Sequence, residues 1–388
     1  MRFACLHHGD PVSESLWSGI PLNIVRTLRE LGHEVVAIGP LNPEAPFVSR
    51  VKTQIYRHIF KKMYLINRDP AVVKKRAPEA NRLLANAGRV DAVLITYPPD
   101  AVQIDRSYPV VIIHDATWTQ LLDFYPGLER EALAAETISG GIELDQMGLD
   151  RCDHVIYSSD WAAGGAISDF GVPQKKVSVA SLGANMKNAP TAADVTSFSL
   201  KRGQGPMKLL FVGKEWHRKG GDIAVSVASE IENLGVPVEL HVVGCDPEGH
   251  VPSFVRPYGW LRKDVPQEAD ELRELYESSD FFIMPTRADC TPVVFAESAA
   301  YGLPTIATDV GGVKDVIRGE WGIALPLGAS PVLYAEWAVK HFKNRVEYER
   351  LSGLARESYE DHLNWPAFCH HLVKVVADLS PVSNGTRS

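Results

Sequence analysis

The sequence predicts an α/β protein built from two halves of similar size, each with a mostly parallel sheet. The chain has 388 residues, which suggests two domains at the usual ~150 residues per domain. Short apolar runs alternate with longer amphipathic segments from end to end, the pattern of strands that are each followed by a helix. Residues 179–205 are rich in Ser, Ala, Asn and Gly and interrupt this alternation, so we interpret them as the linker between the halves.

The predicted elements follow in order along the chain. In the first half we expect a helix at 21–31, which has apolar residues at helical spacing and stops at a glycine. The second half turns helical in its last third. Strands are expected at 3–6, 34–38, 92–95, 110–113 and 154–157, then at 208–212, 238–243, 281–284, 305–307 and 322–325, with late helices at 332–342, 346–362 and 365–379.

These elements predict three segments of chain. The first domain is expected at 1–184 and the second at 185–364. A C-terminal helix within 365–388, followed by a disordered tail, is expected to cross back onto the first domain.

The composition is that of an ordinary globular protein. Hydrophobic residues make up 45% and charged residues 23%, so neither disorder nor a fibrous class is indicated. The net charge of −8 argues against a nucleic-acid partner. Five scattered cysteines without a CxxC pair indicate neither a disulfide framework nor a zinc site and fit a reducing cytosol. With no signal-peptide pattern and no run near the ~20 apolar residues of a membrane span, we expect a cytoplasmic protein.

Two acidic residues eight positions apart stand in the most informative stretch of the chain. Asp289 follows the strand 281–284, and Glu297 lies on a helix predicted to begin near Pro292. Open α/β sheets bind ligands at the loops beyond the carboxyl ends of their strands. Ionised carboxylates accept charge-assisted hydrogen bonds from hydroxyl groups. The pair therefore predicts a polyhydroxyl-binding site, and the alternative is two acids on a solvated surface.

A cationic loop follows the first strand of the second half. Lys214, Arg218 and Lys219 stand beside Gly220 and Gly221, just before a predicted helix. Cationic side chains and backbone N–H groups at a helix N-terminus suit a diphosphate. A solvated basic turn is the alternative. The chain has no P-loop and no strand-linked GxGxxG, which argues against a P-loop ATPase and a dehydrogenase.

Two residues of the first half also follow predicted strands. His114 comes directly after the strand 110–113 and is expected to point into the cleft between the halves, although a structural histidine is the alternative. Gly19 lies between the loop after the first strand and the first helix, where glycine lets the backbone approach a ligand. It could equally mark a plain helix start. No Asp-x-Asp and no His/Cys cluster at ligand spacing occurs, so no catalytic metal is predicted.

Basic residues are concentrated between Arg50 and Arg82. This segment has ten Lys or Arg against two acids, an excess of eight positive charges, and apolar residues such as Ile59 and Phe60 interleave with them. A basic amphipathic element can lie on anionic lipid, at the inner face of the cell membrane, or hold a phosphate-bearing substrate. The alternative is a solvated helix pair.

With these residues in place, the chain resembles the retaining glycosyltransferases of family 4, which have the two-domain GT-B fold. The family's E-x7-E motif is similar to Asp289 through Glu297, and an Ala-x-Gly-x-Pro run follows at 300–304. Its phosphate-binding pair, a basic residue and then Lys-Gly five positions on, is similar to Lys214 and Lys219. The resemblance covers nearly the whole length of the chain.

The resemblance extends to the first half and has two departures. The family's N-terminal glycine loop is similar to the region of Gly19, and its cleft histidine to His114. Asp289 stands where the family usually has Glu, which shortens the side chain by one methylene. Pro292 stands where Gly is common, and proline has no backbone N–H. Backbone donors to the sugar are then expected from Cys290, Thr291, Val293 and Val294.

The resemblance implies transfer of a sugar from a nucleotide diphosphate sugar to an acceptor hydroxyl, with retention of configuration and without a metal or other cofactor. A UDP-sugar is the first choice of donor and a GDP-sugar the second. The acceptor would be a glycan, a lipid-linked molecule or a small molecule in bacterial polysaccharide, glycolipid or glycoconjugate biosynthesis. The alternatives are a GT-B-fold sugar-nucleotide epimerase, which needs no acceptor, and a non-catalytic sugar-binding protein.

The resemblance also assigns roles in the second half. Lys214 and Lys219, joined by Arg218, would neutralise the charge that builds on the leaving diphosphate. Glu297 would accept hydrogen bonds from the ribose hydroxyls. Trp260 and Leu261, in the stretch 256–263, would lie near the base.

The remaining roles concern the transferred sugar. Asp289 and His114 would hold it, and the backbone at Gly19 would approach the phosphates from the other domain. No residue stands out as a covalent nucleophile, which agrees with the front-face mechanism generally proposed for such enzymes.

Overall fold

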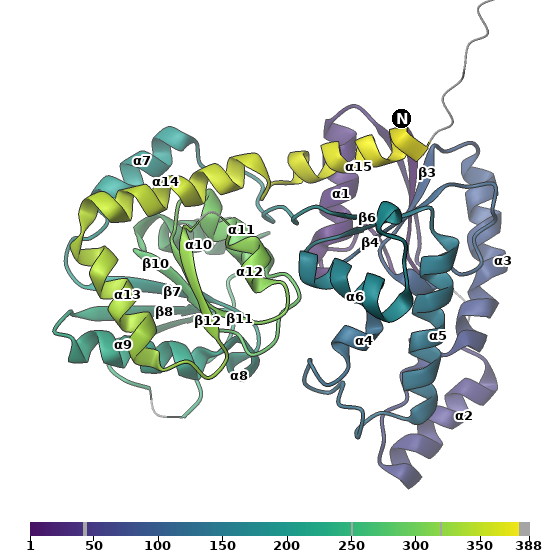
Figure 1. Ribbon diagram of the computed structural model, residues 1–388, viewed down its shortest axis with the longest axis horizontal. Helices are drawn as coiled ribbons and strands as arrows, with labels where there is room; N and C mark the ends of the chain where they lie inside the picture. The colour runs from purple at the N-terminus through teal and green to yellow at the C-terminus, as the bar shows by residue number, and fades with distance from the viewer. Residues whose placement is uncertain (42–44, 250, 319, 380–388) are drawn as a thin grey trace, which may run out of the picture. The chain divides into compact units, whose positions relative to one another are not determined.

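The chain folds into two α/β units, each built on its own parallel sheet (Figure 1). The computed structural model describes residues 1–41, 45–249, 251–318 and 320–379. Unit 1 comprises Met1–Ser181 together with the chain from Trp365, and unit 2 comprises Leu182–Asn364. The disordered tail expected after the C-terminal helix falls on residues 380–388, which lie outside the described residues. Within the described part of the chain, no helix is both long and apolar enough to cross a membrane.

Unit 1 is built on a six-stranded parallel sheet with the order β2-β1-β3-β4-β5-β6. Helices cover it on both faces, so its central strands β1, β3, β4 and β5 are almost continuously apolar and buried. The order places the carboxyl ends of β1 and β3 next to each other. The strands are β1 Arg2–Leu6, β2 Glu34–Ile38, β3 Ala92–Ile95, β4 Val110–His114, β5 His154–Tyr157 and β6 Val177–Val179.

The C-terminal helix α15 (Trp365–Leu379) packs on α1 (Ile20–Glu30) within unit 1. Cys369 Sγ lies 3.9 Å from the carbonyl oxygen of Ile24, and both side chains are buried. The other helices and helical turns of this unit are η1 Leu16–Gly19, α2 Phe47–Ile55, η2 Tyr56–Phe60, η3 Ile66–Arg68, α3 Pro70–Ala87, η4 Pro98–Ala101, α4 Trp118–Leu121, α5 Ala135–Arg151, α6 Asp160–Phe170 and η5 Gln174–Lys176.

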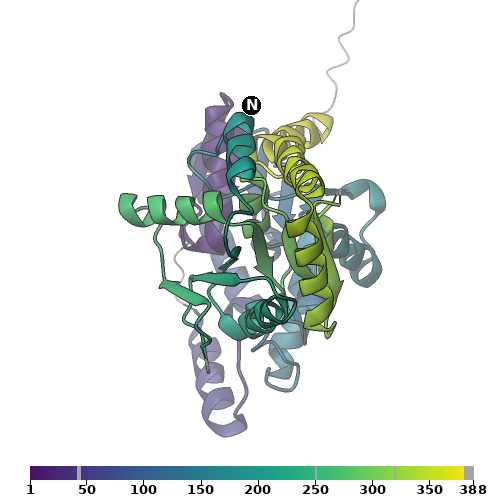
Figure 2. The same cartoon turned by 90° about the vertical axis from the view of Figure 1, so that its left-hand side faces the viewer.

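Unit 2 has a second six-stranded parallel sheet, with the order β12-β11-β10-β7-β8-β9 and helices on both faces (Figure 2). Its strands are β7 Met207–Val212, β8 Val238–Val243, β9 Val255–Gly259, β10 Phe281–Met284, β11 Thr305–Asp309 and β12 Gly322–Pro326. Its helices are α7 Ala192–Lys201, α8 Trp216–Lys219, α9 Gly221–Asn233, α10 Pro266–Ser278, α11 Val293–Ala300, α12 Val313–Val316, α13 Pro331–Lys343 and α14 Arg345–Asp361.

Three elements differ from the sequence-based prediction. The segment 179–205, predicted as a linker, contains α7, which begins at a capping box. Thr191 N donates to Asp194 Oδ2 at 2.9 Å, and Asp194 N donates back to Thr191 Oγ1 at 3.2 Å. The edge strands β6 and β9 were not predicted, because edge strands are short and, as in VRPYG of β9, partly polar and exposed.

Candidate functional site

The loops after β7 and β10 carry the residues predicted to bind diphosphate and sugar. β7 is followed by Lys214 and the short helix α8, and β10 is followed by the loop that holds Asp289. The two strands pair directly, with Phe281 opposite Leu209. Their loops therefore leave the sheet side by side at its carboxyl edge. β7 is also the strand from which the order runs in both directions, so these loops lie at the switch point where such sheets bind ligands.

Gly220 allows these two loops to touch. Its φ is +78°, in the left-handed region that only glycine adopts without steric cost. A Cβ at this position would lie 2.0 Å from the carbonyl oxygen of Pro285. The carbonyl oxygen of Arg218 joins the loops further, because it accepts from Thr286 Oγ1 at 3.1 Å and from Arg287 N at 2.7 Å.

Asp289 forms a buried ion pair with the predicted diphosphate ligands. Lys219 Nζ contacts Asp289 Oδ2, and Arg218 Nη1 lies 4.0 Å from the same oxygen. Asp289 is only 6% exposed, and a buried carboxylate requires such partners. Arg218 also donates to both oxygens of Glu215, each at 2.7 Å, and this interaction lowers the pKa of Glu215. Both cations thus lie close to Asp289 Oδ2, Lys219 in direct contact and Arg218 at 4.0 Å.

Glu297 lies on α11 and is held by two donors. Its Oε1 accepts from Lys263 Nζ at 2.5 Å and its Oε2 from Tyr276 OH at 3.2 Å. Glu297 is 2% exposed. Burial, reinforced by the negative charge of Glu297, raises the pKa of Tyr276 well above its usual value. Lys263 Nζ also donates to the carbonyl oxygen of Asn185 at 3.0 Å. The sequence indicated Glu297 as a candidate and the stretch 256–263, but it did not predict that Lys263 pairs with Glu297.

Lys214 contacts Trp260 rather than the Lys219–Asp289 pair. Its Nζ lies 4.3 Å from the centroid of the Trp260 ring, a cation–π contact. Trp260 follows β9 and is 53% exposed, whereas Leu261 packs on the hydrophobic core. An exposed indole beside a cation offers a face on which a planar ring can stack.

The residues predicted to donate backbone N–H groups surround the start of α11. Cys290 and Thr291 are buried, and the carbonyl oxygen of Cys290 accepts from Gly312 N at 2.9 Å. Val293 and Val294 form the first turn of α11, whose N–H groups have no acceptor within the helix. Pro292 is the N-cap residue.

In unit 1, His114 is the last residue of β4 and contacts the loop that carries Gly19. Its ring stacks on that of Trp17, with centroids 5.3 Å apart and planes at 25°. Its Nδ1 accepts from Ala116 N at 3.2 Å. Trp17 Nε1 donates to Asp115 Oδ2 at 3.0 Å. Trp17 and Asp115 are therefore neighbours of His114, a predicted site residue. The sequence predicted no role for either of them.

The turn η1 adopts an unusual backbone conformation. Trp17, Ser18 and Gly19 are successively left-handed, with φ values of 43°, 55° and 78°. Each non-glycine residue in this region costs roughly 1–2 kcal/mol. Strain of this kind persists where surrounding contacts enforce it, and it is concentrated at ligand sites. The sequence did not predict that Trp17 and Ser18 share the left-handed conformation of Gly19, because neither Trp nor Ser signals a positive φ.

Comparisons with known proteins agree with this architecture. Residues 206–342 match the family described as glycosyl transferases group 1. Over 243 residues the chain is 24% identical to the putative colanic acid biosynthesis glycosyltransferase WcaL of Salmonella typhimurium, covering 58% of this chain and 57% of that protein. The chain spans about half the length of the curated relatives it matches.

Solved structures of glycosyltransferases share the fold over nearly the whole chain. Sucrose-phosphate synthase from Thermosynechococcus elongatus superposes with a TM-score of 0.68 at 17% identity, covering 97% of this chain and 98% of that one. Anabaena HepE in complex with UDP superposes with a TM-score of 0.62 at 15% identity, covering 97% and 99%. The predicted fold class, GT-B with two Rossmann-like units, is confirmed.

We expect Gly220→Ala to destabilise unit 2 more than a left-handed alanine alone does. Gly235 is the matched control, because its φ is also +78° but no atom lies within 4 Å of the added Cβ. Gly235→Ala should cost about 1 kcal/mol in free energy of unfolding, and Gly220→Ala roughly 1–3 kcal/mol more because of the Pro285 clash. Urea denaturation measures both. If both substitutions lower the free energy of unfolding by the same amount, the loops after β7 and β10 can move apart without loss of stability, and their close contact at Gly220 is not needed.

Proposed function

We propose that the protein is a retaining, metal-independent glycosyltransferase that moves a sugar from a nucleotide diphosphate sugar to an acceptor hydroxyl. The observation that carries this proposal is the cluster of Lys219, Arg218 and Asp289 at the switch point of unit 2. It lies within the segment that matches the group 1 glycosyl transferases. The shared fold supports the same assignment.

In this proposal the cations bind the diphosphate as it leaves the sugar. Breaking the glycosidic bond places negative charge on a phosphate oxygen, and preorganised cations stabilise that charge most where it develops. Lys219 is paired with Asp289 in this structure, so an incoming diphosphate competes with that carboxylate for the ammonium group. Once Lys219 binds the diphosphate, the carboxylate oxygens of Asp289 accept hydrogen bonds from hydroxyl groups of the sugar. Lys214, which contacts Trp260, supplies a third cation.

The nucleoside is assigned to Glu297 and Trp260. The ribose hydroxyls donate to Glu297 and take the place of Lys263, which is half exposed and therefore able to move aside. The base stacks near Trp260 and Leu261, beside β9. UDP is the first choice of nucleotide because HepE, which shares the fold, was solved with UDP. GDP is the second choice.

The acceptor and part of the sugar are assigned to unit 1. His114 and the turn at Gly19 contact each other through Trp17, and the strained backbone of that turn is consistent with a ligand site. The relative WcaL is named for colanic acid biosynthesis, which supports a glycan or lipid-linked acceptor of bacterial polysaccharide synthesis.

Turnover should depend on the cations and not on a metal. With a UDP- or GDP-sugar and an acceptor extract, we expect sugar transfer that persists in EDTA and falls at least ~100-fold in Lys219→Ala and Lys214→Ala, because each removes a charge-stabilising donor. Lys201→Ala, an exposed lysine of α7, is the control. Circular dichroism checks that each variant is folded. The double variant Lys219→Met, Asp289→Asn removes both charges of the pair, so a loss of activity in it is not caused by an unpaired buried carboxylate.

Near-normal rates in both lysine variants would contradict the diphosphate assignment. Loss of activity in EDTA that magnesium or manganese restores would contradict metal independence. Conversion of the nucleotide sugar without any acceptor would identify an epimerase instead, and binding without turnover a sugar-binding protein.

Glu297→Gln should weaken the binding of free UDP. The amide accepts through one oxygen only and loses the charge-assisted hydrogen bond, a cost of about 1–3 kcal/mol or roughly 5- to 150-fold in affinity. Calorimetry measures the dissociation constant, with Glu232→Gln on the exposed side of α9 as the control. If the two variants bind equally well, Glu297 has no role in nucleotide binding.

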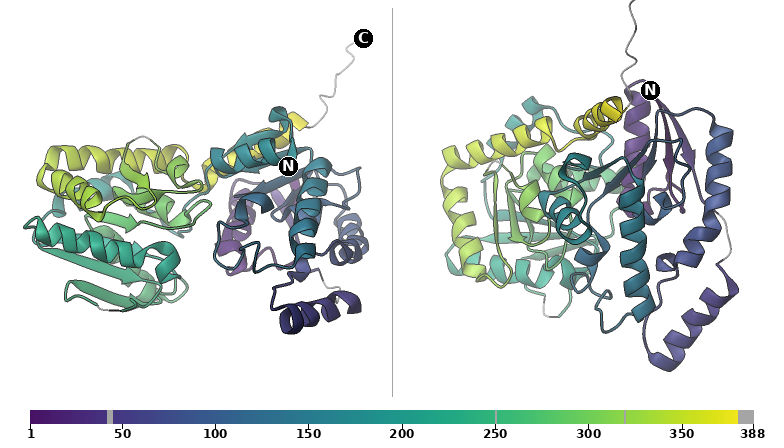
Figure 3. Two further views of the ribbon diagram at one scale, coloured as in Figure 1. Left: turned by 60° about the horizontal axis from the view of Figure 1, so that its bottom comes forward. Right: turned by 45° about the vertical axis from the view of Figure 1, so that its right-hand side comes forward.

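We also propose that the protein contacts an anionic membrane at its surface. The contact involves a shorter segment than the range Arg50 to Arg82 that the sequence suggested. Helix α2 and η2 lie away from the sheet of unit 1 (Figure 3) and expose Phe47, Val48, Ile59 and Phe60, each between 58% and 73%. Arg50, Arg57 and Lys61 are exposed on the same segment.

Not every basic residue between Arg50 and Arg82 belongs to this surface, which corrects the sequence-based picture. Arg68 is buried, with its Nη1 2.6 Å from Asp145 Oδ1, and Lys52 pairs with Glu136. The remaining combination of apolar and cationic side chains suits the interface of an anionic bilayer.

Phe47→Glu with Ile59→Glu should abolish binding to vesicles that contain anionic phospholipid at low salt, because it removes the apolar contact and adds negative charge. Val346→Glu is the matched control, since Val346 is 80% exposed on α14. Co-sedimentation measures binding, which should weaken as salt screens the lysines and arginines. If the unaltered protein does not co-sediment with anionic vesicles at low salt, α2 and η2 are a solvated helix pair and the membrane proposal is wrong.

A further inference from the structure

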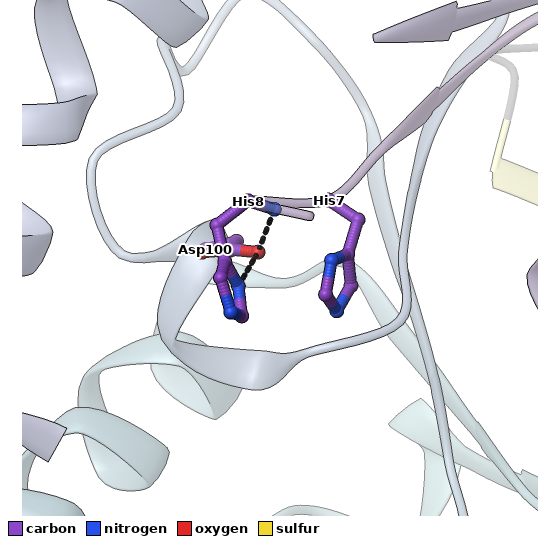
Figure 4. Close-up of side chains that lie close together, drawn as sticks. All are labelled: His7, His8 and Asp100. Carbon is purple, nitrogen blue, oxygen red and sulfur yellow. Dashed lines mark hydrogen bonds and ion pairs between the residues drawn. The ribbon is translucent and has the colours of Figure 1, made fainter. Parts of the chain in front are cut away.

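His7, His8 and Asp100 form a cluster at the carboxyl edge of the sheet of unit 1 (Figure 4). Each offers one ligand atom for a metal ion, and these atoms all lie within 4.8 Å of one another. His7 is 6% and Asp100 8% exposed, and His8 is partly buried. Among the described residues, this is the group of three His, Cys, Asp or Glu side chains that lie close enough together to bind one metal ion.

The cluster lies at the switch point of its sheet. The order runs from β1 to β2 on one side and from β1 to β3 on the other. His7 and His8 directly follow β1, and Asp100 lies in η4 just after β3. Open α/β sheets bind ligands at this position. Unit 2 carries the Lys219–Asp289 pair at its own switch point.

The three side chains are held by rigid elements. His7 N donates to the carbonyl oxygen of Ile38 at 3.1 Å, which continues the strand pairing beyond β1. Asp100 Oδ2 accepts from His8 N at 2.8 Å and lies 2.9 Å from His8 Nδ1. The two imidazoles stack with centroids 4.3 Å apart, and the ring of Tyr97 packs 4.7 Å from that of His8. Any change in the ligand spacing must therefore come from rotation of the three side chains.

Two imidazoles and a carboxylate are a ligand set for a borderline divalent metal. Imidazole nitrogen suits Zn²⁺, Co²⁺ and Ni²⁺, whereas Mg²⁺ and Ca²⁺ prefer oxygen ligands throughout. Ligands about 2.0–2.1 Å from a tetrahedral Zn²⁺ lie roughly 3.3 Å apart. The cluster must contract from its present spread to bind such an ion.

Metal binding also replaces existing interactions. The contact between His8 Nδ1 and Asp100 is exchanged for metal bonds, and the bond from Gly9 N to His7 Nδ1, 2.7 Å long, is exchanged if that nitrogen binds. Arg76 lines a cavity of about 10 Å³ beside Asp100, room for roughly one water molecule, and adds positive charge. Only a metal with strong affinity for imidazole overcomes these costs, which again favours Zn²⁺ over Mg²⁺.

We propose that His7, His8 and Asp100 bind a divalent transition-metal ion of the Zn²⁺ class. The ion would join the start of the β1–α1 loop to the turn after β3. This site shares no residue with those assigned to sugar transfer, and the proposal does not depend on that assignment.

The test uses the whole 388-residue chain without a purification tag, treated with EDTA and then freed of chelator. Titration calorimetry with Zn²⁺ should show one ion bound per chain, and Co²⁺ should give the visible absorption of a low-symmetry site. Mg²⁺ at the same concentrations should give neither heat nor a shift in melting temperature. Absence of a stoichiometric Zn²⁺ or Co²⁺ signal would overturn the proposal.

Variants assign the signal to the cluster. His8→Gln and Asp100→Asn preserve side-chain size and should each weaken Zn²⁺ binding at least ~10-fold, since changes close to a metal cost 10- to 100-fold. His58→Ala is the control, because His58 is exposed on η2 and bonded to Gln54. Their melting temperatures in EDTA show whether the fold survives. If folded His8→Gln and Asp100→Asn bind Zn²⁺ like the unaltered protein, the ion lies elsewhere and the assignment is wrong.

Discussion

The parallel pairing of β7 with β10 is the constraint on which the candidate site of unit 2 depends. These strands are separated along the chain by two others, yet they lie side by side in the sheet. Their loops therefore emerge at one place, and Gly220 removes the side chain that would keep them apart. Lys219 and Asp289 can meet only because both conditions are fulfilled. The same arrangement of a first strand between two neighbours brings residues after β1 and β3 together in unit 1.

The charged groups of unit 2 compensate one another. Asp289 is paired with Lys219, Glu297 with Lys263, and Arg218 with Glu215. Because Asp289 and Glu297 are buried, each would be costly without its cation. Ligand binding at such a site exchanges one set of ionic partners for another, so affinity depends on the difference between them. A substitution that removes one member alters the protein before any ligand arrives.

Much of the fold could be predicted from the sequence because its central strands are continuous apolar runs, as the burial of β3 and β10 requires. The edge strand β9 carries Arg256 and Pro257 and has no such run. Helix α7 begins at a polar capping box within a segment whose composition resembles a loop. In both cases the deciding interactions involve backbone groups and not hydrophobic periodicity.

The candidate site residues also divide into those that a local sequence pattern marks and those that become neighbours only in the folded structure. Lys219, Asp289 and Glu297 could be named as candidates because short spacings and strand ends mark them in the sequence. Lys263 was missed as a partner of Glu297, because the contact spans 34 positions. His8 and Asp100 are 92 positions apart, and only the strand order brings them together. Local patterns identify which residues are available for chemistry, whereas topology decides which of them become neighbours.

The packing of α15 on α1 has a consequence for biosynthesis. Unit 2 is one stretch of chain, Leu182–Asn364, whereas unit 1 combines Met1–Ser181 with the chain from Trp365. During translation, Ile24 cannot reach its contact with Cys369 until all of unit 2 has left the ribosome. Until then, the side of α1 that binds α15 stays uncovered by that helix. The contact of α15 with α1 is therefore the last part of unit 1 that can form during synthesis, whatever the order in which the two sheets fold.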